Sequence, residues 1–200
     1  MLKTFEICPK KFYFRYVKNI AMPVNDEVFE LGKNIHALAS YYLRKENIDK
    51  MEGSLNERES FLWQYLKTVP YFAYEAVATE YNLTVKVSDK FFGGRLDALV
   101  KQGEEFYILD YKTGAAPKNS KYDFQTMIYM LAVRAYYNTN NVTFVYLDLK
   151  NKTEVVIKLT EQLVKEYELK LDEIVTRINK EEYKTNKKSC PCEYDIICYD

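Results

Sequence analysis

An aspartate and a lysine stand two residues apart in the segment ILDYKTG, residues 108–114. Side chains alternate between the two faces of a strand, so Asp110 and Lys112 would project from the same face. Burying charged groups is costly unless they are paired or bind an ion. The pair therefore indicates either a solvated strand end or a chemical site built at the end of a strand.

A second aspartate is expected to lie opposite the first. The segment KQGEE, residues 101–105, separates two strand-like runs and predicts a hairpin turn around Gly103. Folding the chain about this turn places Asp97 almost opposite Asp110, with their Cβ atoms ~5 Å apart. Two carboxylates at that distance destabilise the sheet unless positive charge lies between them, and Lys112 supplies one such charge. A divalent cation held by both carboxylates would supply the rest.

Two further pairs of residues occur at helical spacing. In GKNIH, Gly32 and His36 are four residues apart, and His36 is the only histidine of the chain. In QTMIY, Gln125 and Tyr129 have the same spacing, so each pair would share one helical face. The glycine would allow another segment to approach closely. Alone, each pair is equally typical of an ordinary amphipathic helix.

The elements that must position these residues follow from the hydrophobic periodicity. Residues 27–46 and 55–68 have helical spacing, and a capping box formed by Ser54 and Glu57 is predicted to begin the second helix. Strands are predicted at residues 74–87, 94–100, 106–112, 142–149 and 154–159, and two later helices at 121–138 and 161–182. This order is αβββαβ with additions at both ends. The lack of repeats and flexible linkers predicts a single domain over residues 1–200.

Composition limits the classes of function. The chain carries 29 basic and 29 acidic residues, so its formal net charge is zero. This balance excludes a strongly basic coat for nucleic acid, and any DNA contact must come from a local patch. No apolar run approaches the ~18–20 residues that span a bilayer, and charges interrupt the N-terminal segment. We therefore expect a cytoplasmic protein without membrane contact.

Taken together, GKNIH, GGRLD, LDYKTG and QTMIY, which lie between residues 32 and 129, resemble the motifs of the PD-(D/E)XK nuclease superfamily. The segment CPKKFYFRYV, residues 8–17, is similar to the usual opening of the RecB-type nuclease branch, which includes the CRISPR-associated adaptation exonucleases. The resemblance implies an α/β (α+β) fold with a restriction-endonuclease-like core, in which helices flank a mixed central sheet. Leu96 occupies the place of the family's usual proline, a departure that is common in this branch.

The resemblance also implies roles for individual residues. His36, Asp97, Asp110 and the main-chain oxygen of Tyr111 would bind a catalytic Mg²⁺ or Mn²⁺. Hard oxygen ligands suit both ions, and a histidine ligand favours tolerance of Mn²⁺. Lys112 would either activate the attacking water or neutralise charge that develops on the scissile phosphate.

Three more residues are candidates for the same site. Gln125 and Tyr129 would position either the phosphodiester or the lysine. Glu80, in the segment ATEYNL, resembles an acidic position that often precedes the G-x-x-D motif of this branch. A surface glutamate on a strand fits the sequence of this segment equally well.

The cysteines are distributed unevenly along the chain. Cys8 lies near the start, whereas Cys190, Cys192 and Cys198 lie among the last eleven residues. Structural disulfides are not expected in a reducing compartment, so the spacing needs another explanation.

The resemblance suggests that the cysteines bind metal. Some members of this branch hold a [4Fe–4S] cluster with one N-terminal and three C-terminal cysteines, which implies that residues 1–20 and 183–200 are joined as a clasp. Only Pro191 separates the first two C-terminal cysteines, where most relatives have two residues, so either the tail bends differently or one thiol is not a ligand. A Cys₄ zinc site and free or regulatory thiols are the alternatives.

The implied function is a metal-dependent DNA exonuclease that acts on single-stranded DNA or DNA ends in CRISPR adaptation, recombination or repair, with an integrase or a helicase as a protein partner. The alternative is a non-catalytic DNA-binding or protein-docking module of the same fold. Such a module has no reason to retain Asp97, Asp110 and Lys112. An endonuclease with restriction-like specificity would need a target-recognition region, for which the chain leaves little room.

Overall fold

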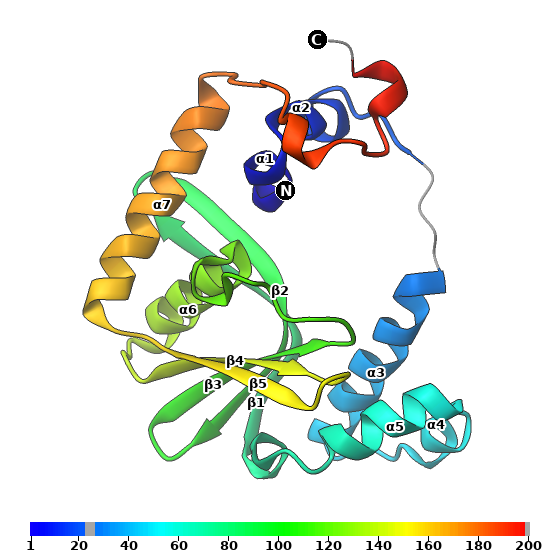
Figure 1. Cartoon of the computed structure of the whole chain (residues 1–200). Coiled ribbons are helices and arrows are strands. Elements are labelled where there is room, and N and C mark those ends of the chain that lie inside the picture. Colours follow the sequence, from blue (N-terminus) through cyan, green and yellow to red (C-terminus); the bar gives the residue numbers. More distant parts are fainter. Residues whose placement is uncertain (23–26, 199–200) are drawn as a thin grey trace. The chain divides into compact units, whose positions relative to one another are not determined.

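The structure, a computed structural model, describes residues 1–22 and 27–198. These residues form two compact units, one of residues 27–167 and the other of residues 1–22 and 168–198. The larger unit contains the sheet and all of the candidate catalytic residues (Figure 1). In the part of the chain that is described, no helix combines the length and the apolar character needed to cross a membrane.

The larger unit is built on a five-stranded sheet with the order β1-β2-β3-β4-β5. β3 and β4 pair parallel, the other neighbours pair antiparallel, and the helix α6 (Phe124–Tyr137) makes the crossover that a parallel pair requires. This mixed sheet with flanking helices confirms the predicted α+β fold. The strands are β1 (Glu75–Val87), β2 (Lys90–Gln102), β3 (Glu105–Lys112), β4 (Val142–Asp148) and β5 (Thr153–Lys158).

β2 and β3 form the hairpin that the sequence predicts. They close on a two-residue turn in which Gly103 has a φ of +59°. Residues with a Cβ rarely adopt this conformation, so glycine suits the position. Pairing between the strands ends at Ala98 and Leu109. Asp97 and Asp110 therefore occupy the next position of the register, where the two strands begin to separate.

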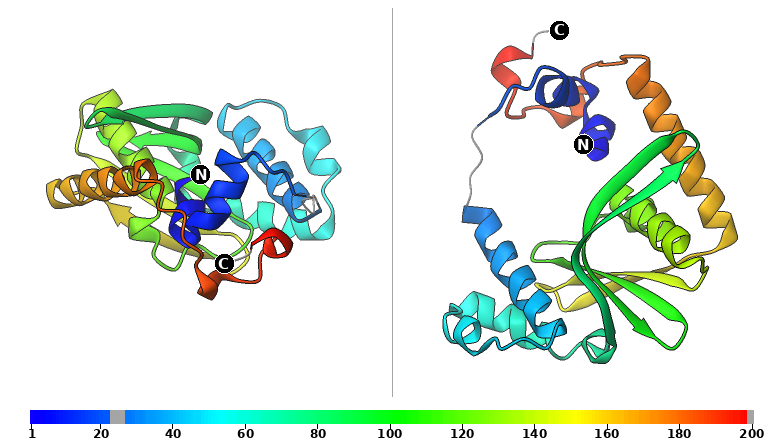
Figure 2. Two further views of the ribbon diagram at one scale, coloured as in Figure 1. Left: turned by 90° about the horizontal axis from the view of Figure 1, so that it is seen from above. Right: turned by 180° about the vertical axis from the view of Figure 1, so that it is seen from behind.

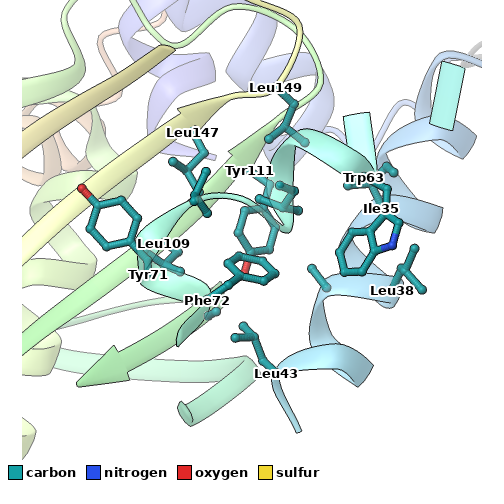
Figure 3. Close-up of a cluster of buried hydrophobic side chains, with 14 of the residues drawn as sticks. Ile35, Leu38, Leu43, Trp63, Tyr71, Phe72, Leu109, Tyr111, Leu147 and Leu149 are labelled. Carbon is teal, nitrogen blue, oxygen red and sulfur yellow. The ribbon is translucent and has the colours of Figure 1, made fainter. Parts of the chain in front are cut away.

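Helices cover both faces of the sheet. α3 (Glu27–Leu43) and α5 (Glu57–Leu66) contribute to a buried cluster on one face, together with alternate residues of β2, β3 and β4. α6 lies on the other face, where the ring of Tyr129 stacks on Phe144 with their centroids 6.5 Å apart. Figure 3 shows the first cluster, which includes Ile35, Leu38 and Trp63 from the helices and Leu109, Tyr111 and Leu147 from the strands.

The capping box of α5 differs from the prediction. The side chain of Asn56 accepts the main-chain N–H of Glu59, and the Glu59 carboxylate accepts the main-chain N–H of Asn56. The box therefore lies two residues beyond the predicted pair, Ser54 and Glu57. The reason is the short helix α4 (Asp49–Gly53), which the sequence did not predict. Ser54 is the C-cap residue of α4, and its hydroxyl donates to the main-chain oxygen of Met51.

β2 begins four residues earlier than predicted, at Lys90 rather than at residue 94. It pairs with β1 as far as Val87, which makes a long two-stranded hairpin. Gly93 and Gly94 lie inside this strand, and glycine is uncommon there. The two glycines therefore hid the start of the strand from a reading based on periodicity.

The smaller unit contains both ends of the described chain, which lie side by side in both views of Figure 2. Its N-terminal part consists of α1 (Leu2–Ile7), α2 (Pro9–Phe12) and a π-helical turn (Tyr13–Val17). Its C-terminal part includes the end of α7 (Glu161–Asn179) and two short 3₁₀ turns, Lys187–Ser189 and Asp195–Ile197.

Polar contacts join the two ends within this unit. The side-chain amide of Asn186 donates to the main-chain oxygen of Ile7 at 2.7 Å. The hydroxyl of Tyr194, which is buried, donates to the main-chain oxygen of Ile20 at 2.8 Å. The first of these hydrogen bonds is exposed and the second is partly buried, and both connect the two terminal segments.

Candidate active site

Three side chains that can bind a metal ion meet where β2 begins to separate from β3. His36 comes from α3, Glu80 from β1 and Asp97 from β2, and one ligand atom of each lies within 4.8 Å of the others. Nδ1 of His36 is 3.3 Å from Oδ1 of Asp97 and 4.0 Å from Oε1 of Glu80. We call these three residues the acidic group.

The hydrogen bonds of His36 fix the orientation of its ring. Nε2 lies 3.0 Å from the main-chain oxygen of Tyr111, and because a carbonyl oxygen only accepts, Nε2 carries the proton. Nδ1 of the neutral ring then presents a lone pair to Asp97, and a proton or a cation must lie between them. Burial lowers the pKa of His36, but the hydrogen bond and charge of Asp97 outweigh it and raise the pKa above 6.5. A histidine that gives one N–H to a carbonyl oxygen and turns the other nitrogen to a cation is the usual arrangement of metal ligands.

Asp97 links the acidic group to the sheet. Its Oδ2 accepts the main-chain N–H of Tyr111 at 2.8 Å. The main-chain pairing between β2 and β3 ends at Ala98, so the N–H of Tyr111 has no main-chain acceptor on β2. The carboxylate of Asp97 accepts this N–H instead. One oxygen of the carboxylate is thus fixed by the backbone, and the other faces His36.

Glu80 reaches the acidic group through an unusual backbone conformation. Its φ is +49°, although Thr79 and Tyr81 on either side of it pair with β2. A non-glycine residue in the left-handed region costs free energy, and such residues are concentrated at functional sites. The conformation turns the carboxylate toward His36, and Oε2 lies 2.8 Å from Nε of Arg95.

Asp110 lies beside the acidic group. Its side chain is 2% exposed, and Oδ2 is 2.6 Å from Nζ of Lys112. Burial is the main cause that raises the pKa of Asp110 to about 6, and the charge of Asp97 adds to it, whereas Lys112 opposes the shift. The two carboxylates therefore interact as like charges across the end of the hairpin.

Lys112 is held by three partners. Besides Asp110, its ammonium lies 3.3 Å from Oε1 of Gln125 and 5.5 Å from the ring centroid of Tyr146. Tyr146 is fully buried, and its hydroxyl lies 2.8 Å from that of Thr126. No motif of the sequence marks Tyr146 as part of the site. Knowledge of strand pairing would have found it, because Tyr146 is the partner of Asp110 in the parallel pair of β3 and β4.

Tyr129 is packed against β2. Its hydroxyl donates to the main-chain oxygen of Arg95 at 2.6 Å. A Cβ on Gly94 would lie 2.7 Å from the ring of Tyr129, so only glycine leaves room for this contact. The helical spacing of Gly32 and His36 predicts a close approach at Gly32, but there the nearest atom to an added Cβ would be 3.8 Å away, which is an ordinary contact. The glycine that the site requires is therefore Gly94.

The donor atoms of the site fit a hard divalent cation. Carboxylate oxygens with one imidazole nitrogen suit Mg²⁺ and Mn²⁺. The acidic group provides these atoms within 4.8 Å of one another. Burial raises the pKa of Asp110 and the charge of Asp97 raises it further, and a bound cation would stabilise both carboxylates in their charged form.

The four cysteines lie in the smaller unit. Cys8 is buried, Cys192 and Cys198 are half-buried, and Cys190 is exposed. Loss of hydration and then the neighbouring thiols of Cys192, Cys198 and Cys8 raise the pKa of the Cys190 thiol. All four cysteines therefore belong to one compact unit, although they come from opposite ends of the chain.

The fold and the site together define a nuclease. Acidic residues at the point where β2 and β3 separate, a histidine from α3 and a lysine two residues after Asp110 form a site for a dication on an αβββαβ core. The model of the PD-(D/E)XK nuclease superfamily matches residues 1–199, and the chain belongs to this superfamily.

The chain is also similar to two individual proteins. The CRISPR-associated exonuclease Cas4 of Francisella tularensis subsp. novicida (strain U112) is 24% identical over 160 residues, which cover 78% of this chain and 76% of that protein. The crystal structure of a putative exonuclease from Eubacterium rectale superposes with a TM-score of 0.60 and 11% identity, covering all of this chain and 87% of that one. At this identity the second likeness supports the fold alone.

Proposed function

We propose that this nuclease is a deoxyribonuclease that uses Mg²⁺ or Mn²⁺ and degrades single-stranded DNA or DNA from free ends. The observation that carries the proposal is the acidic group, whose ligand atoms lie within 4.8 Å of one another beside the ion pair of Asp110 and Lys112. A bound dication would polarise the scissile phosphate and lower the pKa of a water molecule.

The ligands of the cation would come from four side chains and one main-chain oxygen. Nδ1 of His36 and the carboxylates of Glu80, Asp97 and Asp110 hold the cation. The main-chain oxygen of Tyr111 keeps a second lone pair after it accepts the N–H of His36, so it can serve as a further ligand. Because β2 and β3 are packed on both faces, these groups are fixed before substrate binds.

Lys112 supplies the positive charge next to the reacting phosphate. Its ammonium remains 2.6 Å from Asp110 and within reach of Gln125, so it can neutralise developing charge or orient the attacking water. Gln125 positions this lysine. Tyr129 positions β2 by its bond to the main chain of Arg95.

The relative from Francisella tularensis supports the finer part of the proposal, because that protein is a CRISPR-associated exonuclease. We extend this to a role in CRISPR adaptation, recombination or repair, with an integrase or a helicase as partner. The zero net charge of the chain means that DNA must be held by local charge at the site.

The test is a cleavage assay with end-labelled single-stranded DNA, double-stranded DNA and single-stranded RNA, each with Mn²⁺, Mg²⁺ or EDTA. We expect cleavage of the DNA single strand with a dication, and none in EDTA or with Asp110→Ala. Glu59→Gln is the control, because Glu59 is a buried acid in the capping box of α5. Cleavage in EDTA would overturn the mechanism, and binding of DNA without any cleavage would favour a non-catalytic module.

We also propose that Cys8, Cys190, Cys192 and Cys198 bind a [4Fe–4S] cluster. The placement of all four cysteines in one compact unit built from both chain ends supports this proposal. Protein purified without oxygen should be brown and contain iron and sulfide, and Cys8→Ser should lose both the colour and the iron. A colourless protein with stoichiometric zinc would support the Cys₄ zinc site instead.

A further inference from the structure

Arg95 stands at the edge of the acidic group with most of its guanidinium free. It precedes Asp97 by two residues on β2, so both side chains belong to one face of the strand. Nε of Arg95 lies 2.8 Å from Oε2 of Glu80, yet the side chain is 62% exposed. Among the described residues, Glu80 is the one acid that pairs with it. The two terminal amino groups of the guanidinium therefore face solvent.

The backbone of Arg95 is held more firmly than its exposure suggests. Its main-chain oxygen accepts the hydroxyl of Tyr129 at 2.6 Å, and the ring of Tyr129 fills the space that a side chain at Gly94 would take. Asn82 pairs with it on β1. An exposed arginine on such a fixed segment loses less conformational freedom when it binds a ligand.

The charges of the site leave room for one anion when Arg95 is included. Glu80, Asp97 and Asp110 carry three negative charges, which Lys112 and a dication would balance. Arg95 then adds one unbalanced positive charge next to the acidic group. A phosphodiester carries one negative charge, so a single backbone phosphate would restore neutrality.

We infer that Arg95 binds a backbone phosphate of the nucleic-acid substrate at the entrance of the site. This inference rests on the proposed function. A guanidinium suits the task because its paired terminal amino groups match two phosphate oxygens, whereas lysine offers only a point charge. Nε remains on Glu80 and aims the terminal groups outward, away from the cation ligands.

The alternative to phosphate binding is that Arg95 only neutralises Glu80. The ion pair between the two side chains would by itself explain the position of Arg95. The two roles differ in what the loss of Arg95 changes. A phosphate-binding residue contributes to the salt dependence of DNA binding, whereas a partner of Glu80 alters the affinity of the acidic group for the dication.

The experiment measures binding of a fluorescent single-stranded oligodeoxynucleotide to the full chain at several KCl concentrations, with Ca²⁺ as the dication and electrophoresis to verify that the DNA is intact. Arg95→Ala should make the slope of log affinity against log salt shallower by ~0.7, the value for one contact to a single strand. Arg95→Lys should keep most of the slope but bind several-fold more weakly. Lys101→Ala, which removes a cation at the hairpin end of the same strand, should leave the slope unchanged.

Dication affinity is measured in parallel, from the effect of Mn²⁺ on thermal unfolding without DNA. A shallower slope with unchanged Mn²⁺ affinity supports the inference. An unchanged slope overturns it, and an unchanged slope with altered Mn²⁺ affinity assigns Arg95 to Glu80 alone. Cleavage by the wild-type chain is scored separately, so an inactive wild type refutes the proposed function, whereas an active wild type with an unchanged slope in Arg95→Ala refutes only the role of Arg95.

Discussion

Nδ1 of His36 faces Oδ1 of Asp97 at 3.3 Å, while the opposite nitrogen of the same ring donates to the main chain of β3. The ring is thus held from behind by Tyr111, whose own N–H is held by the second oxygen of Asp97. Two acceptors that are fixed so close together need positive charge between them. This relationship makes binding of a dication the first property to test.

Mn²⁺ should stabilise the protein through Asp97. A ligand that binds only the folded chain adds about 2.7 kcal/mol when its concentration is a hundred times its Kd. Asp97→Asn should lose most of this stabilisation, and Glu75→Gln, which changes an exposed acid at the start of the neighbouring strand, should keep it. The measurement is thermal unfolding followed by fluorescence of Trp63, the only tryptophan. Equal shifts in wild type and Asp97→Asn would contradict the site.

Asp110→Asn should make the metal-free protein more stable while abolishing cleavage. Burial and then Asp97 raise the pKa of Asp110 to about 6, so the charged form is disfavoured in the folded state. A neutral amide removes that cost, and the shift corresponds to a gain on the order of 1–3 kcal/mol at neutral pH. Urea unfolding in EDTA measures it.

The control for this gain is another buried acid. The Glu59 carboxylate accepts hydrogen bonds from Asn34 and from the main chain of Asn56. Glu59→Gln should therefore be neutral or destabilising, because it replaces a satisfied acceptor. If Asp110→Asn destabilised the metal-free protein as well, the repulsion between Asp97 and Asp110 would be too small to matter.

The symmetry of a hairpin made part of the site predictable. The turn at Gly103 follows from residue type, and strand alternation then placed Asp110 and Lys112 on one face and Asp97 opposite. The structure brings these residues together with His36, because the ladder that ends at Ala98 leaves Asp97 to bond β3. The local sequence pattern was therefore sufficient to predict the contacts that a single hairpin turn determines.

Other parts of the site depend on contacts between distant segments, which periodicity does not encode. The left-handed conformation of Glu80 is imposed by its surroundings, and Arg95 was passed over because its partner lies on another strand. Tyr146 meets Asp110 only through the parallel pairing of β3 and β4. The capping box at Asn56 and Glu59 was missed because two overlapping segments had the same spacing, and packing of α4 decided between them.

Low pH should decrease the free energy of unfolding by protonating Glu52. Hydrogen bonds from Lys67 and then from Trp63 lower the pKa of Glu52 below 4.5. A lowered pKa stabilises the fold above the unfolded value, and this stability is lost as the pH falls through the folded value. Glu52→Gln should cost less than about 1 kcal/mol at neutral pH, because the pair is partly exposed to solvent.

The difference between wild type and Glu52→Gln should shrink as the pH falls below the ordinary pKa of 4.5 and disappear below the lowered pKa of the folded protein. Urea unfolding at neutral and acidic pH, followed by Trp63 fluorescence, measures it. Glu104→Gln is the control, because that carboxylate is 88% exposed in the hairpin turn. A difference that persists unchanged in acid would show that packing of the side chain, and not its charge, supports α4.

The aromatic ring of Tyr146 should support catalysis by holding the ammonium of Lys112 through a cation–π interaction. The ammonium of Lys112 lies 5.5 Å from the ring centroid, and a cation over a desolvated ring gains about 0.5–2 kcal/mol. Tyr146→Leu should lower kcat roughly 2-fold to 30-fold if that interaction is lost in the transition state. Tyr146→Phe keeps the ring and should stay near wild type, although it loses the bond to Thr126.

Tyr167→Leu separates this effect from a general loosening of the core. Tyr167 is also fully buried, and it lies on α7, a helix that contributes no residue to the site. Its hydroxyl donates to the main-chain oxygen of Lys121 at 2.8 Å. Both leucine variants should lose similar stability, but only Tyr146→Leu should lower kcat with little change in KM. If Tyr167→Leu lowered kcat as much, or if Tyr146→Phe were as slow as Tyr146→Leu, the ring would not be what positions Lys112.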